Sequence, residues 1–141
     1  MDTSVKKIFI PMAMILVALL FILGGAATST AAKPANVSCP ATIEWQLAPQ
    51  AEITSFACEV GTFKKKTALI YTVSIKNTSK EALRYRLNIF LLDQDKAAGH
   101  LIPRKGKPPV VKPGETVTVK VPFFNADTMA KNLLVVVKTI K

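Results

Sequence analysis

The two cysteines are the residues of this sequence whose chemistry is most definite. Cys39 and Cys58 are the only thiols among 141 residues, and they are too far apart for a redox Cys-x-x-Cys motif. A zinc site would need a second pair. They either form a disulfide or stay as two buried free thiols. We expect the disulfide, worth about 3 kcal/mol through restriction of the unfolded chain, because the N-terminal segment predicts export to an oxidising compartment.

Other side chains suited to catalysis are few. A hydrolase triad needs a nucleophile, a base and an orienting group, and His100 is the single imidazole. It follows a predicted turn without a diagnostic serine or cysteine motif nearby, so we interpret it as a surface histidine. The carboxylates are scattered over predicted strands and turns, and the sequence has no glycine-rich phosphate loop. We therefore expect a protein that is not an enzyme and needs no metal or cofactor.

Asp93 and Asp95 have the spacing that begins a calcium-binding loop. An EF-hand loop needs a glycine at its sixth position and a glutamate at its twelfth. Here the glycine comes at Gly99, and no glutamate follows at the required distance. We interpret the pair as part of an ordinary acidic turn.

The N-terminal segment, residues 1–32, has the three-part organisation of a secretory signal peptide. Lys6 and Lys7 precede an uncharged apolar run at 8–23, and small residues end at Ala32, after which we expect cleavage. The alternative is an uncleaved membrane anchor, although the run is shorter than the ~20 residues that cross a bilayer. Both alternatives export the rest of the chain. We expect a periplasmic or secreted protein or, with the anchor, an inner-membrane protein whose domain lies outside the cytoplasm.

The exported part, residues 33–141, is basic and long enough for one small domain. The whole chain has 19 lysines and arginines against 9 acids, a formal charge of +10. Export separates this charge from nucleic acid, and the aromatic groups that stack on bases are few. Nucleic acid is therefore not an expected partner, and a membrane is expected as one only if the N-terminal segment is uncleaved.

Alternation of apolar and polar residues is the main structural signal in this part. Every second residue is apolar at 69–75 and again at 83–91, and the polar segment 77–81 between them has turn chemistry. Two such runs joined by a short polar segment predict a β-hairpin, with each strand burying one face.

Further strands are predicted on both sides of this hairpin, and no helix is convincing. Residues 41–57 contain a hairpin or two successive strands, and residues 61–66 form the exit turn of the second one. Pro113 and Gly114 have the chemistry of a type II turn. Several short strands separated by turns predict an all-β fold, an antiparallel two-sheet immunoglobulin-like sandwich of about seven strands. The candidates are 43–47, 52–60, 69–75, 83–91, a short strand near His100, 117–123 and 132–140.

Three features are candidate contact sites. Trp45 could stack on a ligand, but its place in an alternating row favours the core. Phe90 and Leu92 share the outward side of their strand with arginines, so they mark either a partner surface or a patch covered by a neighbouring loop or edge. The segment after His100 has prolines and no acid, and we interpret it as a polyanion-binding loop or as solvated lysines that protect an edge. Its basic residues are Arg104, Lys105, Lys107 and Lys112.

The segment 77–95, NTSKEALRYRLNIFLLDQD, followed by 111–123, VKPGETVTVKVPF, resembles the FxLYD-type domain of bacterial exported proteins, an immunoglobulin-like sandwich. The match covers about residues 52–140 and departs from the pattern at Ile89 and Leu92, where aromatics are expected. The resemblance implies a fold and no catalytic residue. The matching positions are Asn77, Thr78, Ile89, Leu91, Leu92, Asp93, Pro113 and Gly114.

Three functions are compatible with these features. The first is a non-catalytic binding or assembly module that contacts another extracytoplasmic protein through a sheet edge or through the face of Phe90 and Leu92. The second is a basic module that binds polyanions or anionic cell-surface material through its charge. The basic residues that would carry it are those at 64–66, Arg84, Arg86 and the loop 104–112. The third, a protease inhibitor that presents loops from an immunoglobulin-like frame, has the fold alone in its favour.

Overall fold

A computed structural model describes residues 34–141. The expected signal peptide, its cleavage after Ala32 and the alternative anchor lie outside these residues. No helix within 34–141 is long and apolar enough to cross a membrane. The described chain forms eight strands: β1 (Val37–Ser38), β2 (Thr42–Leu47), β3 (Ala51–Phe63), β4 (Lys66–Asn77), β5 (Arg84–Leu91), β6 (Lys96–Ile102), β7 (Thr116–Phe124) and β8 (Asn132–Ile140).

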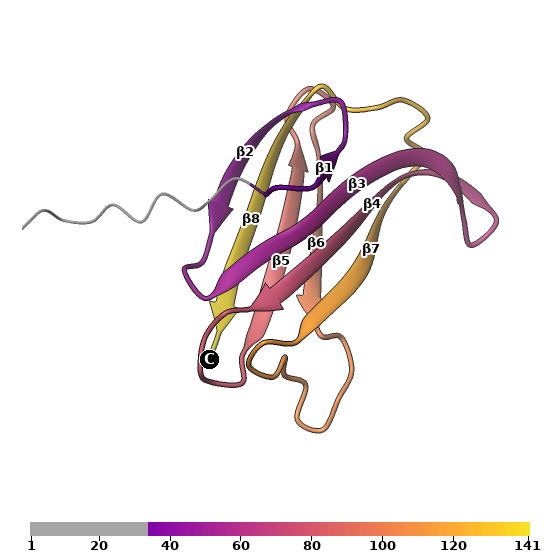
Figure 1. Ribbon diagram of the computed structural model, residues 1–141. Coiled ribbons are helices and arrows are strands. Elements are labelled where there is room, and N and C mark those ends of the chain that lie inside the picture. The colour runs from indigo at the N-terminus through magenta and orange to yellow at the C-terminus, as the bar shows by residue number, and fades with distance from the viewer. Residues whose placement is uncertain (1–33) are drawn as a thin grey trace, which may run out of the picture.

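The strands form two four-stranded sheets that pack face to face (Figure 1). The first sheet has the order β1-β3-β4-β7, and the second has the order β2-β8-β5-β6. The predicted two-sheet β-sandwich is therefore confirmed, with eight strands in place of about seven. Most neighbours are antiparallel, but β1 runs parallel to β3 and β2 runs parallel to β8. The sequence pattern did not predict these two parallel pairs.

The core lies between the two inner faces and follows from the alternation in the sequence. β4 and β5 are its largest contributors, with four core residues each, since alternate side chains of these strands are buried against the other sheet. Burial of each large aliphatic side chain stabilises the fold by about 1.5–3 kcal/mol. Trp45 is partly buried and packs edge-on against Phe56 of the core, with ring centroids 5.1 Å apart, which agrees with its interpretation as a packing residue. The β4 and β5 core residues are Leu69, Tyr71, Val73, Ile75, Tyr85, Leu87, Ile89 and Leu91.

The predicted hairpin between β4 and β5 is wrong. β4 belongs to the first sheet and β5 to the second, so the segment 78–83 crosses from one layer to the other. Alternation shows that one face of a strand is buried, and it does not show which strand is its hydrogen-bonded neighbour. For residues 41–57 the sequence left two alternatives open, a hairpin or two successive strands. The second alternative, two successive strands, is correct, because β2 and β3 lie in different sheets.

Asn77 holds the crossing between β4 and β5. It is the one fully buried polar side chain among the described residues. Its amide donates to Glu81 O at 2.7 Å and to Val111 O at 2.9 Å, and its carbonyl oxygen accepts from the Ser79 backbone N–H at 2.9 Å. Its backbone N–H donates to Glu115 O, and its backbone oxygen accepts from Gly114 N–H. One residue therefore satisfies polar groups of two connecting loops at once.

The β3–β4 hairpin is longer than the sequence predicted. β3 continues through Gly61 to Phe63, so the expected exit turn at 61–66 is reduced to Lys64 and Lys65. Both lysines have positive φ, 49° and 66°, as a two-residue type I′ turn requires. Left-handed backbone costs about 1–2 kcal/mol for a residue other than glycine, so this turn is strained.

The predictions of a type II turn and of a disulfide agree with the structure. Gly114 has φ 75°, and the Glu115 N–H donates to Lys112 O at 3.0 Å, which fits the predicted type II turn. The predicted disulfide is also confirmed: Cys39 and Cys58 are bonded, with their Cα atoms 5.1 Å apart. The bridge ties the segment before β2 to the middle of β3. It indicates an oxidising environment.

Replacing Asn77 with alanine should destabilise the sandwich by about 3 kcal/mol, because the carbonyls of Glu81 and Val111 and the N–H of Ser79 lose their partner. Urea unfolding followed by tryptophan fluorescence measures this loss. Thr78→Ala is the matched control, since Thr78 is the exposed neighbour, and it should leave the midpoint nearly unchanged. Equal midpoints for the two variants would contradict the role assigned to Asn77.

Candidate functional site

His100 and Asp93, which the sequence offered for catalysis and metal binding, belong to the strands and turns that form the frame of the sandwich. His100 lies within β6 opposite Leu87, half-buried, and not beside the turn as predicted. Burial, helped by the charge of Arg104, lowers its pKa. No group of three or more histidine, cysteine or acidic side chains within residues 34–141 is arranged to hold a metal ion.

Asp93 links the turn after β5 to the start of β8 through its carboxylate. Its two carboxylate oxygens accept hydrogen bonds from the backbone N–H groups of Lys131 and Asn132, at 3.0 and 3.2 Å. These bonds lower the pKa of the carboxyl group, because they favour its charged form. The turn after β5 is thereby joined to the start of β8, which gives Asp93 a structural role.

The structure separates Phe90 from Leu92. Phe90 lies on the outer face of the second sheet, whereas Leu92 lies beyond the end of β5, in the turn, and is 56 % exposed. The sheet instead brings Phe90 between Leu134 of β8 and Ala97 of β6, its neighbours in register. Leu134, Phe90 and Ala97 form an apolar line, here called the Phe90 row, that runs outward to the edge strand.

Sequence reasoning missed Leu134 and Ala97 because the contact depends on strand order. Neither residue is conspicuous in its own segment, where apolar side chains are common. The other end of the row is polar, since Glu44 of β2 lies next to Leu134. The apolar character of the row therefore continues up to β6 and stops before β2.

A small hollow adjoins the Phe90 row on β6. It has a volume of about 210 Å³ and is lined by Arg86, Asn88, Gly99, His100 and Leu101. Gly99 lies directly under the Asn88 side chain: a Cβ at this position would come within 2.8 Å of Asn88 Oδ1. Glycine therefore allows Asn88 to lie over the edge strand.

The free side of β6 follows from the hydrogen-bond pattern. The Leu92 N–H donates to Asn132 O at 2.9 Å, on the β8 side of β5. Peptide groups alternate between the two sides of a strand, so the odd-numbered residues of β5 pair with β6. The register then leaves the N–H and C=O groups of Ala97, Gly99 and Leu101 on the free side. None of the three carries a charge or is a proline.

The edge of the first sheet is different. Asn77 exchanges backbone bonds with Gly114 and Glu115, on the β7 side of β4, so the even-numbered residues of β7 lie on its free side. Among them are Lys120 and Pro122. Proline offers no N–H to an incoming strand, and a lysine along the edge disfavours pairing. β7 is therefore a protected edge and β6 is an open one.

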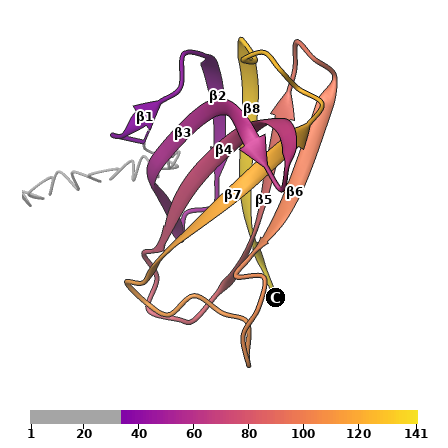
Figure 2. The same ribbon diagram turned by 90° about the vertical axis from the view of Figure 1, so that its right-hand side faces the viewer.

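The predicted basic loop leaves the lower end of the sandwich in Figures 1 and 2. Residues 103–115 connect β6 to β7, and the loop is tied to the body by the bridge between Leu83 and Val111. Gly106 has φ 146°, and a Cβ there would approach the Pro108 oxygen and the Pro109 Cα to 3.0 Å, so glycine is required. All four predicted basic residues are exposed: Arg104, Lys105, Lys107 and Lys112.

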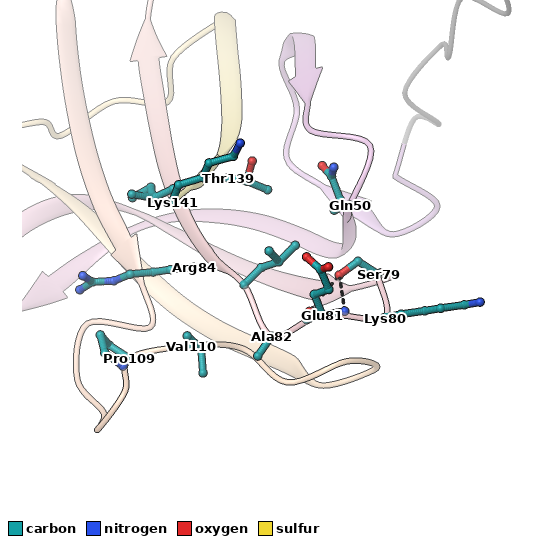
Figure 3. Close-up of a pocket in the computed structure, with 12 residues that line it drawn as sticks. Gln50, Ser79, Lys80, Glu81, Ala82, Arg84, Pro109, Val110, Thr139 and Lys141 are labelled. Carbon is teal, nitrogen blue, oxygen red and sulfur yellow. Dashed lines mark hydrogen bonds between the residues drawn. The ribbon is translucent and has the colours of Figure 1, made fainter.

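A groove of about 790 Å³ lies beside this loop (Figure 3). Its walls come from the crossing segment after Asn77, the loop near Val110 and the end of β8. Arg84 and Lys80 extend in opposite directions, with Glu81 and Ser79 between them. Sequence reasoning did not find the groove, because its walls are far apart in the chain. The lining residues are Gln50, Ser79, Lys80, Glu81, Ala82, Leu83, Arg84, Pro109, Val110, Thr139, Ile140 and Lys141.

Comparisons of the chain with protein-family models, curated proteins and solved structures found no match. The resemblance to the FxLYD-type domain therefore stays a prediction. The positions on which it rests have structural roles here: Ile89 and Leu91 lie in the core, Asp93 joins β5 to β8, and Asn77 holds the crossing.

Proposed function

We propose that this protein is a non-catalytic exported module that binds an extended segment of another extracytoplasmic protein along the free edge of β6. The observation that carries the proposal is the contrast between the two edges on this side of the sandwich. β7 is blocked by Pro122 and charged at Lys120, whereas β6 offers unblocked peptide groups at Ala97, Gly99 and Leu101. Natural sheets usually protect such edges, so an open one is a candidate site for strand addition.

Side chains next to the edge supply the second part of the proposed site. A strand added beside β6 would place alternate side chains over the outer face of the second sheet. One of them would continue the Phe90 row beyond Ala97, and another would lie at the hollow around Gly99 and Leu101. Backbone pairing would give affinity, and these two positions would give specificity.

The disulfide supports the proposed location. A bonded Cys39 and Cys58 pair persists in the periplasm or outside the cell, where the partner would also be found. The predicted signal peptide agrees with this location. We therefore propose a periplasmic or secreted protein as partner.

Ala97→Pro should abolish partner binding and leave the fold intact, because the N–H that it removes points away from β5. A photo-crosslinking residue placed at Leu101 and activated in living cells, followed by mass spectrometry, reports binding. We expect the crosslinker at position 101 to capture one defined partner when the rest of the chain is unchanged, and none when Ala97→Pro is also present. Circular dichroism melting checks that the variant is folded.

The matched control is Thr118, which lies at the free side of the protected edge strand β7. A crosslinker at Thr118 should not capture the partner, and Thr118→Pro should not affect capture at Leu101. Capture that persists in a folded Ala97→Pro variant, or that is equal from the two edges, would contradict strand addition at β6.

A second candidate function, polyanion binding, is supported by the basic loop at the lower end of the sandwich. The four basic side chains of the loop are exposed, the segment from Arg104 to Lys112 has no acid, and the adjoining groove adds Arg84 and Lys141. Such a cluster attracts anionic polymers through charge, so the interaction weakens as the salt concentration rises.

Reversing Lys105 and Lys107 to glutamate should make the protein elute from an anionic column at clearly lower salt than the parent chain. Lys131→Glu with Lys138→Glu is the matched control, since it makes the same change in net charge away from the loop. If the two double variants shift equally, retention depends on net charge and the loop has no special role.

A further inference from the structure

The β3–β4 hairpin extends beyond the rest of the first sheet, at the right of Figure 1 and toward the viewer in Figure 2. Pairing between β4 and β7 ends at Ala68 and Phe124, but β3 and β4 stay paired as far as Phe63 and Lys66. The last part of the hairpin is therefore a two-stranded ribbon. Residues 61–67 together with Phe124 are called the hairpin tip below.

The hairpin tip carries two aromatic side chains, Phe63, which is half-buried, and Phe124, which is exposed. Phe63 and Phe124 come from different strands, and their ring centroids are 6.0 Å apart. Phe124 is 40 % exposed, whereas its neighbour Phe123 is buried in the core. Val60, at the base of the ribbon, is also 40 % exposed. Two of the three most exposed large apolar side chains of the described residues thus lie at or beside the hairpin tip.

Lysines surround these rings. Lys64 Nζ lies 5.9 Å from the centroid of Phe63, and Lys66 Nζ lies 6.0 Å from that of Phe124. Lys65 lies between them in the strained turn, and Lys96 Nζ reaches the Asn125 backbone oxygen at 3.3 Å. The nearest acid along β3 is Glu59. Residues such as Asn-Gly fit a type I′ turn without strain, so the two lysines at this position act against the stability of the hairpin.

We propose that the hairpin tip docks on the surface of an anionic phospholipid membrane, with Phe63 and Phe124 at the level of the headgroups and the lysines on the phosphates. Aromatic rings favour this interface, and each lysine near an anionic leaflet adds attraction. A hydrated polyanion would satisfy the lysines but leave the exposed surface of the two rings in water. The basic loop at 103–115, which has no aromatic residue, is the better site for such a polymer.

This inference does not depend on strand addition at β6, because the hairpin tip belongs to other strands. It also goes beyond the expectation that a membrane is a partner only through an uncleaved N-terminal segment. The sandwich would contact the membrane through the hairpin tip, whether or not that segment is present.

A local probe tests the proposal in the full chain. Phe124→Trp places a tryptophan at the hairpin tip, and vesicles with brominated acyl chains quench tryptophans that reach the lipid. Phe90→Trp, on the outer face of the second sheet, is the matched probe away from the tip. Trp45 is common to both proteins, so its signal in the parent chain is subtracted.

We expect mixed phosphatidylglycerol and phosphatidylcholine vesicles to quench Phe124→Trp strongly, pure phosphatidylcholine to quench it weakly, and Phe90→Trp to be unaffected. Adding Lys64→Gln and Lys66→Gln should raise the lipid concentration for half-maximal quenching roughly twenty-five-fold, since each lysine contributes about fivefold. Lys105→Gln with Lys107→Gln, which removes the same charge from the basic loop, should leave it unchanged.

Three results would overturn the proposal. The first is vesicle binding by flotation without quenching of Phe124→Trp, which would show attraction by charge alone. The second is equal quenching of Phe90→Trp, which would show contact away from the hairpin tip. The third is an equal loss with the basic-loop variant, which would mean that net charge and not the hairpin tip determines binding.

Discussion

The buried side chain of Asn77 is the constraint on which the arrangement of this sandwich depends. A polar group inside a protein is tolerated when its hydrogen bonds are made, and Asn77 makes them to the crossing segment and to the loop before β7. The chain consequently leaves the first sheet at the end of β4 and enters the second at β5. A tight turn at the same place would have returned β5 beside β4.

The crossing determines which surfaces are exposed. With β5 in the second sheet, β8 takes one of its sides and β6 the other, which leaves β6 as the last strand of that sheet. The same geometry aligns Leu134, Phe90 and Ala97 across three strands and ends this line at the open edge. In the first sheet the last strand is β7, where Pro122 and Lys120 oppose pairing. β7 thus opposes pairing with a further strand and β6 does not, and this difference is the basis of the proposed function.

The sequence predicted local features well and long-range pairing poorly. Strand positions, the type II turn at Gly114 and the bond between Cys39 and Cys58 follow from periodicity, turn chemistry and compartment, which are local properties or properties of few residues. The β4–β5 hairpin was wrong because a buried face can pack against the opposite sheet as well as belong to a paired neighbour. Leu134 and Ala97 were missed for the same reason. Pro122, within a strand, was an available sign of an edge.

Amide hydrogen exchange along β6, followed by NMR in the isolated protein, tests the central claim most directly. The N–H groups of Ala97, Gly99 and Leu101 should exchange rapidly, while those of Ala98 and His100, which bond to β5, should be protected. Addition of the captured partner should then protect the first three. If all five amides are equally protected in the isolated protein, the edge of β6 is already covered and no site for an added strand exists.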